Sequence, residues 1–433
     1  MTESMSNLEL AVHFFLQLAI ILVACRAVGA IAVWIGQPQV VAEMITGVML
    51  GPSLFGLFLP EIQQAVFPWD STEQFRDTQS YLFPASQLGL ALYMFIVGME
   101  FRVDILRGNF RSSIVVSLAG MIAPFVLGAG LGWYWHQHTD LFPEKTSLME
   151  ATLFLGASMC ITAFPMLARI IHFKGLHGTQ MGTVAIGAGA IDDATAWGLL
   201  AIVLASFQRD FRIAATNLSL AVAFVLVVTL VLRPLLRFCE RYVVKDGDLT
   251  DLGFVLGLVC VCLGAWFTDL IGLHAVFGSF VMGSAMPRGF MAPALIKRIQ
   301  PLTVAFLLPL FFTYSGLNTK IGLLNSWPMW GMCGLVLLAA ILGKGVACWG
   351  AARLSGLPNR EALGIGTLMN ARGLMELIII NIGLRAGIIS EELFAALVLM
   401  AVVTTFMASP IFDVLVDRQT VIEQSKAGAA KPI

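Results

Sequence analysis

Apolar residues gather along the chain in windows of about 20 residues, the length that a helix needs to span a bilayer. Short polar turns separate these windows, so the pattern predicts a succession of transmembrane helices. We place thirteen of them, at residues 9–35, 39–57, 80–99, 112–135, 147–171, 178–206, 212–236, 250–269, 271–287, 300–318, 327–353, 361–385 and 391–415. The ninth and tenth windows are interrupted by Gly and Pro, which leaves their ends the least well defined.

Composition supports the same fold class. Of the 433 residues, 58% are hydrophobic and 12% are charged, whereas soluble domains carry roughly 25% charged residues. We therefore expect an all-α polytopic membrane protein. The short turns leave no room for a soluble catalytic domain, and the seven cysteines lack the spacing of metal ligands. We expect neither an enzyme nor a bound cofactor, and no nucleic-acid partner.

Basic residues fall mostly in every second turn, among them Arg102, Arg107, Arg233 and Lys297. Cytoplasmic loops of membrane proteins are enriched in Lys and Arg, so this asymmetry predicts an N-terminus outside the cell and a C-terminus in the cytoplasm. Residues 416–433 would then be a short cytoplasmic tail of a protein in the cell, or inner, membrane.

The two halves of the chain share weak internal similarity. The third window ends in LYMFIVGMEFRVDIL (92–106) and the tenth in LPLFFTYSGLNTKIGLL (308–324), each an aromatic-rich run that Gly and a polar turn close. The first six windows would then match the last six, with residues 212–236 as a linker helix. Because seven helices is an odd number, the second six-helix repeat is inverted, as in many secondary transporters.

Corresponding helices of the two repeats carry signals of a break. One reads MCITAFPMLAR (159–169), where Pro165 disfavours a continuous helix, and the other reads MNARGLMEL (369–377), where Asn370 and Arg372 interrupt an apolar span. Unwound backbone at membrane depth is tolerated only where it is buried in protein or lines a cavity. The half-helix ends would then point at one shared site. The alternative is that Pro165 merely kinks a packed helix.

Two adjacent carboxylates lie in the middle of an apolar run, in GAIDDATAW (189–197). A carboxylate at membrane depth costs roughly 2.5–3.5 kcal/mol, so a functional role is the default interpretation. Neighbouring helix residues point about 100° apart, so one aspartate can face a hydrated cavity while the other faces a counter-charge. Lys344 is the candidate counter-charge. A purely structural ion pair would leave the second aspartate without a role.

Several motifs together resemble the monovalent cation/proton antiporter superfamily, in the branch of bacterial sodium/proton and potassium/proton exchangers and plant cation/proton exchangers. They are PQVVAEMITGVMLGPSLFG (38–56), ITAFPMLARII (161–171), GAIDDATAW, the Gly-Lys pair that ends at Lys344, and MNARGLMELIIINIGL (369–384). The likeness covers nearly the whole chain. It implies that Asp193 binds the cation or the proton, while Asp192 pairs with Lys344.

The resemblance also implies a homodimer embedded in membrane lipid. Residues 1–57 and 250–287 would form a dimerisation scaffold, and residues 80–206 and 300–415 a mobile core. Many plant exchangers carry Asn-Asp where this chain has Asp192-Asp193, and the double aspartate matches electrogenic bacterial sodium/proton antiporters. Sodium and potassium therefore both stay open as substrates.

Other polar residues of the broken helices have competing interpretations. Arg372 and Glu376, four residues apart, are expected to neutralise each other in a structural or gating ion pair, with Glu43 as a further candidate member. Thr162 and Asn370 are candidates to coordinate a cation, although most hydroxyls at this depth only bond to nearby helices. Histidines near the loops are candidate pH sensors or plain solvated side chains: His136, His138, His172 and His177.

Together with the resemblance, these observations predict an antiporter that exchanges cytoplasmic sodium, or alternatively potassium, for external protons by alternating access. The resemblance implies that the core slides against the scaffold. A sodium-coupled symporter of an organic solute on a related fold stays open as the alternative. An intramembrane aspartyl protease is excluded, because its two aspartates must meet from separate helices. A passive channel would need neither Lys344 nor broken helices.

Overall fold

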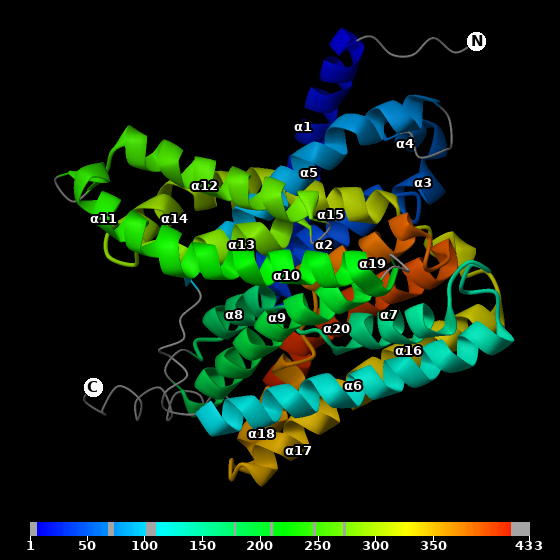
Figure 1. The fold of residues 1–433 in the computed structure, drawn as a ribbon. Coiled ribbons are helices and arrows are strands. Elements are labelled where there is room, and N and C mark those ends of the chain that lie inside the picture. The colour runs from blue at the N-terminus through cyan, green and yellow to red at the C-terminus, as the bar shows by residue number, and fades with distance from the viewer. Residues whose placement is uncertain are drawn as a thin grey trace. The chain divides into compact units, whose positions relative to one another are not determined.

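The computed structural model describes residues 7–67, 73–100, 110–176, 179–207, 211–245, 248–271 and 274–416, which are nearly all helical (Figure 1). The exceptions to helix are turns and one antiparallel pair of two-residue strands, β1 (Val244–Lys245) and β2 (Asp248–Leu249). The expectation of an all-α polytopic protein is confirmed.

The helices of the first half are α1 (Asn7–Trp34), α2 (Gln39–Leu50), α3 (Phe55–Phe58), α4 (Pro60–Val66), α5 (Glu73–Glu100), α6 (Phe110–His138), α7 (Leu148–Cys160), α8 (Phe164–Phe173) and α9 (Gln180–Phe207). The middle of the chain holds α10 (Phe211–Val227), η2 (Val228–Leu232), α11 (Arg233–Val243), α12 (Asp251–Leu270) and α13 (Ala275–Ala285). The remainder holds α14 (Met291–Leu302), η3 (Thr303–Leu307), α15 (Leu308–Leu317), η4 (Ile321–Leu323), α16 (Trp327–Ile341), η5 (Leu342–Val346), α17 (Ala347–Leu354), α18 (Asn359–Leu368), α19 (Leu374–Ala386) and α20 (Glu391–Leu415).

Every predicted window contains helix, and nine helical spans among the described residues are long and apolar enough to cross a membrane. The total of thirteen membrane crossings stays a prediction. The tenth window was placed too late, because its helix begins at Met291 rather than at residue 300. Residues 291–299 form an amphipathic extension, in which Leu295 and Ile299 are buried while basic residues lie on the other side. The second window agrees with the span Gln39–Phe58, within which α2 ends at Leu50 and a Gly-Pro turn leads into α3.

The chain folds into two compact units. One comprises Met1–Ala24, Phe58–Phe101 and Leu204–Tyr314, and the other comprises Cys25–Leu57, Arg102–Val203 and Ser315–Ile433. The second unit contains all the residues that the sequence marked as a site. These units are defined by packing, whereas the expected scaffold and core are defined by movement, so the expected division stays a prediction.

Glycines allow close helix packing inside the first unit. A side chain at Gly98 on α5 would lie 2.2 Å from the carbonyl oxygen of Phe280 on α13, and one at Gly283 would lie 2.1 Å from that of Phe95. Gly278 on α13 meets α12 in the same way. Small residues at such crossings let helix backbones approach closely in an apolar environment. The resulting core is a layer of α5, α12 and α13.

In the second unit, α6 packs along α7 and contacts α16, η5 and α17, while α20 lies against α16, α18 and α19 (Figure 1). A capping box starts α7, because the Ser147 hydroxyl accepts from the Glu150 N–H and the Glu150 carboxylate accepts from the Ser147 N–H. Ser390 caps α20 through the Leu393 N–H. These caps define where the helices around the site begin.

Candidate functional site

Both predicted breaks are present in the second unit. The chain leaves helical geometry between the end of α7 at Cys160 and the start of α8 at Phe164, and again between Leu368 of α18 and Leu374 of α19. The two interruptions touch, because the Ala163 N–H donates to the Ala371 carbonyl at 3.3 Å. The four half-helices therefore end at one place.

The sequence interpretation placed Pro165 inside the break. In the structure, Pro165 instead lies in the first turn of α8. A proline there lacks an N–H that would have no intrahelical partner anyway, so it favours a helix start rather than a kink. The interruption itself consists of residues 161–163.

Two cations satisfy the end of α7. The Arg372 guanidinium donates to the carbonyls of Ser158 at 3.4 Å and Met159 at 2.7 Å, and the Lys344 ammonium donates to the carbonyl of Cys160. The last carbonyls of a helix have no intrahelical donor and carry partial negative charge. Lys344 and Arg372, both fully buried, therefore bind the C-terminus of α7 as well as their carboxylate partners.

Asp192 on α9 has a full set of donors. Its Oδ1 accepts from the Ser117 hydroxyl at 2.5 Å, its Oδ2 accepts from the Thr162 hydroxyl at 2.6 Å, and the Lys344 Nζ lies 3.4 Å from Oδ2. All four side chains are buried. The structure thus contains the expected contact between Asp192 and Lys344. It also places Thr162 on this carboxylate.

Asp193 has the opposite surroundings. Its side chain is 0% exposed, and among the described residues neither carboxylate oxygen has a hydrogen-bond donor. A buried ionised carboxylate without a partner is unfavourable by several kcal/mol. The chemistry of this residue therefore requires a bound cation or a proton.

Lys344 lies in the π-helical turn η5, between α16 and α17. Such turns are rare and occur frequently at functional sites. Glycines flank the lysine: a side chain at Gly343 would lie 3.1 Å from the Pro124 Cα of α6, and one at Gly345 would lie 2.7 Å from the Asn370 amide nitrogen. The small neighbours let this segment approach both α6 and the second break.

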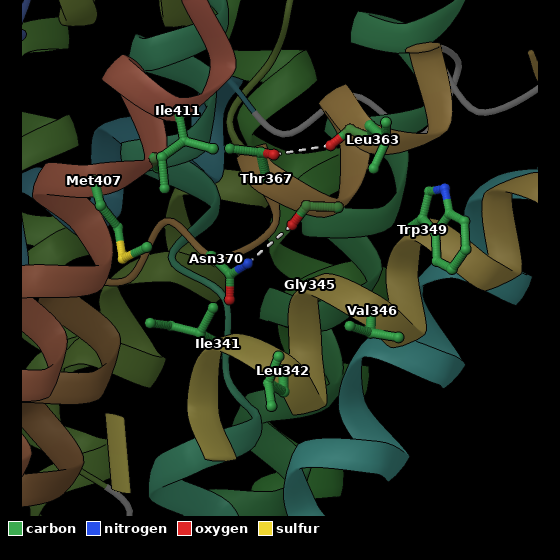
Figure 2. A pocket seen from close by; sticks show the side chains of 12 residues that line it. Ile341, Leu342, Gly345, Val346, Trp349, Leu363, Thr367, Asn370, Met407 and Ile411 are labelled. Carbon is green, nitrogen blue, oxygen red and sulfur yellow. Dashed lines mark hydrogen bonds between the residues drawn. The ribbon is translucent and has the colours of Figure 1, made fainter. Parts of the chain in front are cut away.

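Asn370 faces a different part of the unit from Thr162. Its amide nitrogen donates to the Gly366 carbonyl at 3.0 Å, and the side chain lines a pocket beside η5 and α20 (Figure 2). Within the described part of the chain, no hydrogen bond joins Asn370 to either aspartate. Coordination of a cation by Asn370 stays a prediction.

Arg372 and Glu376 form the expected ion pair, at 3.1 Å and almost fully buried. They do not share a helix, since Arg372 belongs to the break and Glu376 to the first turn of α19. Thr405 of α20 holds the arginine backbone: its hydroxyl accepts from the Arg372 N–H at 3.0 Å and donates to the Arg372 carbonyl at 2.8 Å. Whether this pair is structural or gating stays open to test.

Glu43 lies apart from that pair. It is a buried residue of α2 that accepts a hydrogen bond from the Gln39 side chain. The described contacts include no hydrogen bond or ion pair from Glu43 to Arg372 or Glu376. Its proposed membership in their ion pair stays a prediction.

The sequence interpretation missed Ser117 and Thr405. Ser113 and Ser117 stand four residues apart in apolar α6 and are both buried, which is a pattern of one polar helix face. That spacing was a usable signal. The Thr404-Thr405 pair in α20 offered no comparable signal for Arg372.

Of the four loop histidines, His136 and His138 bond to nearby carbonyls of α6 and its loop, the His172 side chain is not described, and His177 lies outside the described residues.

Comparison with known proteins places the chain in a family. Residues 16–418 match the family described as sodium/hydrogen exchanger, transmembrane. The chain is 38% identical over 395 residues to the Na(+)/H(+) antiporter NhaS4 of Synechocystis sp., an alignment that covers 90% of this chain and 94% of the relative. It is 33% identical over 405 residues to cation/H(+) antiporter 20 of Arabidopsis thaliana, covering 91% of this chain and 47% of the relative. The chain thus spans about half the length of that plant protein.

A solved structure shares the fold. The sodium proton antiporter MjNhaP1 of Methanocaldococcus jannaschii matches with a TM-score of 0.63 at 14% identity, over 95% of this chain and 99% of the other. At that identity the likeness concerns the fold alone, and membership rests on the sequence matches. The chain belongs to the sodium/hydrogen exchanger family of transmembrane proteins.

Proposed function

We propose that this protein is a secondary antiporter that exchanges a monovalent cation, sodium in the first place and potassium as the alternative, for protons. The relatives that carry sodium/proton and cation/proton names support this substrate class. A third relative, the K(+)/H(+) antiporter 1 of Saccharomyces cerevisiae, keeps potassium open. The protein is a transporter on this proposal and not an enzyme.

One observation carries the proposal at the level of residues: the carboxylate of Asp193 is buried and has no donor, whereas that of Asp192 has three. A carboxylate without a fixed partner can take either a cation or a proton. The two ligands then exclude each other on Asp193, and this competition is the coupling that exchange requires. Asp192 is already committed to Ser117, Thr162 and Lys344, so its role is to position the site.

The charge balance fits a monovalent cation. Two carboxylates and one ammonium leave a net charge of −1 in the empty, deprotonated site, and one Na⁺, K⁺ or H⁺ makes it neutral. A divalent cation would leave a net positive charge in a buried environment, which is costly. Thr162 lies at the junction of the breaks and is a candidate to supply a neutral oxygen.

Transport requires that the site open to one face of the membrane at a time. Our proposal is an elevator, in which a core with the broken helices moves against a dimerisation scaffold of a homodimer. The touching breaks support it, because one compact site can travel as a unit. We place the protein in the cell membrane, with the N-terminus outside and the C-terminus in the cytoplasm.

The decisive experiment replaces Asp193 by asparagine. A neutral amide can neither release a proton nor neutralise a cation, so Asp193→Asn in proteoliposomes should abolish collapse of an imposed pH gradient by sodium or potassium. The assay contains no organic solute, so activity of the wild-type protein would also exclude an obligatory solute symporter. Flux is read from a pH-sensitive dye inside the vesicles.

Asp140→Asn is the matched control, because Asp140 is exposed in a loop between α6 and α7 and should keep full activity. Size-exclusion chromatography of both variants checks that they fold. Substantial cation-driven proton flux through folded Asp193→Asn would overturn the assignment.

A further inference from the structure

A pocket of about 180 Å³ opens on the second unit, between η5, α17, α18 and α20 (Figure 2). Its walls are apolar, formed by side chains such as Ile341, Leu342, Val346, Met407 and Ile411. No charged side chain lines it, and neither aspartate of the transport site does. The cavity is therefore separate from the pair of aspartates to which the proposed exchange is assigned.

Among the polar side chains that line this pocket, every hydrogen-bonding group has a partner except one oxygen. Thr367 donates to the Leu363 carbonyl at 2.9 Å, and the Trp349 indole donates to the Asn359 side chain at 2.9 Å. Asn370 donates to the Gly366 carbonyl at 3.0 Å, but its Oδ1 has no donor, although the residue is only 6% exposed.

The orientation of the Asn370 amide follows from its bond. The Gly366 carbonyl can only accept, so the atom that faces it is the nitrogen and the free atom is the oxygen. Figure 2 shows this oxygen turned away from the Gly366 bond and toward Ile341. A buried acceptor is thus held in an apolar pocket without a partner.

The chemistry of the pocket restricts what can bind there. Its volume is close to that of an apolar cavity of about 150 Å³ that holds benzene. A water molecule needs two to four polar partners, and in this lining the one polar side-chain atom without a hydrogen bond is the Asn370 Oδ1. A charged ligand would lose its hydration without a counter-charge. The complement is a neutral molecule with one apolar ring or short chain and a single hydroxyl or N–H donor.

The pocket is accessible from a surface that suits such a molecule. Its rim includes Leu342, Val346 and Trp349, which are 49%, 52% and 36% exposed on helices apolar enough to cross a membrane. The source of the ligand is then the bilayer, in which small amphiphiles concentrate. We propose that this pocket binds a small neutral amphiphile that enters from the lipid and donates one hydrogen bond to Asn370.

Binding there should slow exchange, an effect that rests on the proposed function. Asn370 belongs to the second break, and Gly345 at the pocket wall is next to Lys344. A ligand that bonds to Asn370 and packs against η5 holds both segments in one arrangement. The site itself, however, can be tested without any transport measurement.

The test uses 4-bromobenzyl alcohol, whose bromine quenches tryptophan, and 1-bromo-4-ethylbenzene, which has the same shape without a donor. The fluorescence of the full-length protein is measured in lipid nanodiscs, and the Trp349 signal is the difference between wild type and Trp349→Phe. The alcohol should quench this signal saturably. At equal concentration in the bilayer it should bind about fivefold tighter than the ethyl analogue, the factor for a hydrogen bond worth about 1 kcal/mol. Asn370→Leu should erase that preference.

Two filled-pocket variants, Ala408→Phe and Ile411→Phe, should remove the saturable quenching, while Val414→Phe on the exposed side of the same helix should keep it. Equal binding of both probes, as for a groove that takes lipid chains, would overturn the proposal, as would quenching that survives both filled variants.

Saturating alcohol should also slow cation-driven proton flux at least twofold in wild type and not in the filled variants. If the alcohol quenches Trp349 but does not slow proton flux, the binding site is supported and its effect on exchange is overturned. If the wild-type protein shows no exchange at all, the proposed function is overturned but the binding site is not.

Discussion

At the scale of single residues, the site is a contrast between neighbours. Asp192 accepts from two hydroxyls and lies beside an ammonium, while Asp193 has no donor among the described residues. Each charge-assisted hydrogen bond is worth about 1.5–3 kcal/mol, so Ser117, Thr162 and Lys344 together hold the Asp192 side chain in one position. The adjacent carboxylate has no fixed partner, and on the proposed function it takes a cation and a proton in turn.

This contrast predicts a specific pH dependence. On the proposed function, protons and cations compete for Asp193, so the apparent KM for sodium should rise as the pH falls, by up to about tenfold per unit once the site is mostly protonated. Initial rates of proton flux in proteoliposomes, measured over sodium concentration at each pH, give the KM. A KM that stays flat from pH 6 to 9 would exclude simple competition at one carboxylate.

At the scale of elements, the site depends on helix ends that meet. The C-terminus of α7 is satisfied by Lys344 from η5 and by Arg372 from the break before α19. Thr405 of α20 then holds the backbone of Arg372. These cations do two tasks, because each also faces a carboxylate. Removal of either cation therefore leaves both a helix end and a buried carboxylate without that partner.

We predict a stability cycle for the Arg372–Glu376 pair. Arg372→Gln leaves Glu376 buried without a counter-charge and should lower the free energy of unfolding by about 3–5 kcal/mol. Adding Glu376→Gln should recover part of this loss, because the uncompensated charge is gone. Thermal unfolding in detergent measures both variants.

The surface pair Lys320–Glu391 provides the control for that cycle. Its carboxylate is half exposed, so Lys320→Gln should cost about 0–1 kcal/mol. A double variant no more stable than Arg372→Gln would show that the arginine matters through the α7 carbonyls and not through Glu376.

At the scale of the whole molecule, the charges of Asp192 and Asp193 determine how the proposed exchange would respond to the membrane potential. The empty site carries two carboxylates and one ammonium, and Lys344 is 3.4 Å from Asp192. If Lys344 leaves Asp192 and releases its proton when the cation binds, a second proton enters the cycle. One net charge then crosses per turnover, which is worth about 2.3 kcal/mol per 100 mV.

We therefore predict electrogenic exchange. A potassium-valinomycin diffusion potential imposed on proteoliposomes, assayed with sodium, should speed or slow the flux according to its sign. Asp192→Asn leaves Lys344 without its carboxylate partner and should make the flux indifferent to potential. A wild-type rate that ignores the sign of the potential would leave Asp192 as a structural partner of Lys344 only.

The order of helices, their apolar composition, the two breaks and the charged residues in the membrane were all readable from the sequence. The reason is that a bilayer imposes a length on each span, and a charge or proline inside a span is rare enough to stand out. Asp192 and Lys344 lie 152 positions apart in the chain, and their pairing was predicted from a resemblance rather than from spacing. The structure then showed the two side chains in contact.

Tertiary structure alone decided which oxygens have donors. Thr405 looks like an ordinary helix hydroxyl in the sequence, and the spacing of Ser113 and Ser117 indicates a polar helix face but not its partner. The contacts of Ser117 and Thr405 depend on how α6 and α20 pack around the breaks. Arg372 was assigned to Glu376 by proximity in the chain, yet it also satisfies carbonyls more than 200 residues away. Asn370 was grouped with Thr162 because both lie at a break, and the fold turned them toward different surroundings. Sequence identifies residues that are costly to bury, whereas the partners that offset this cost come from distant segments and exist only once the chain has packed.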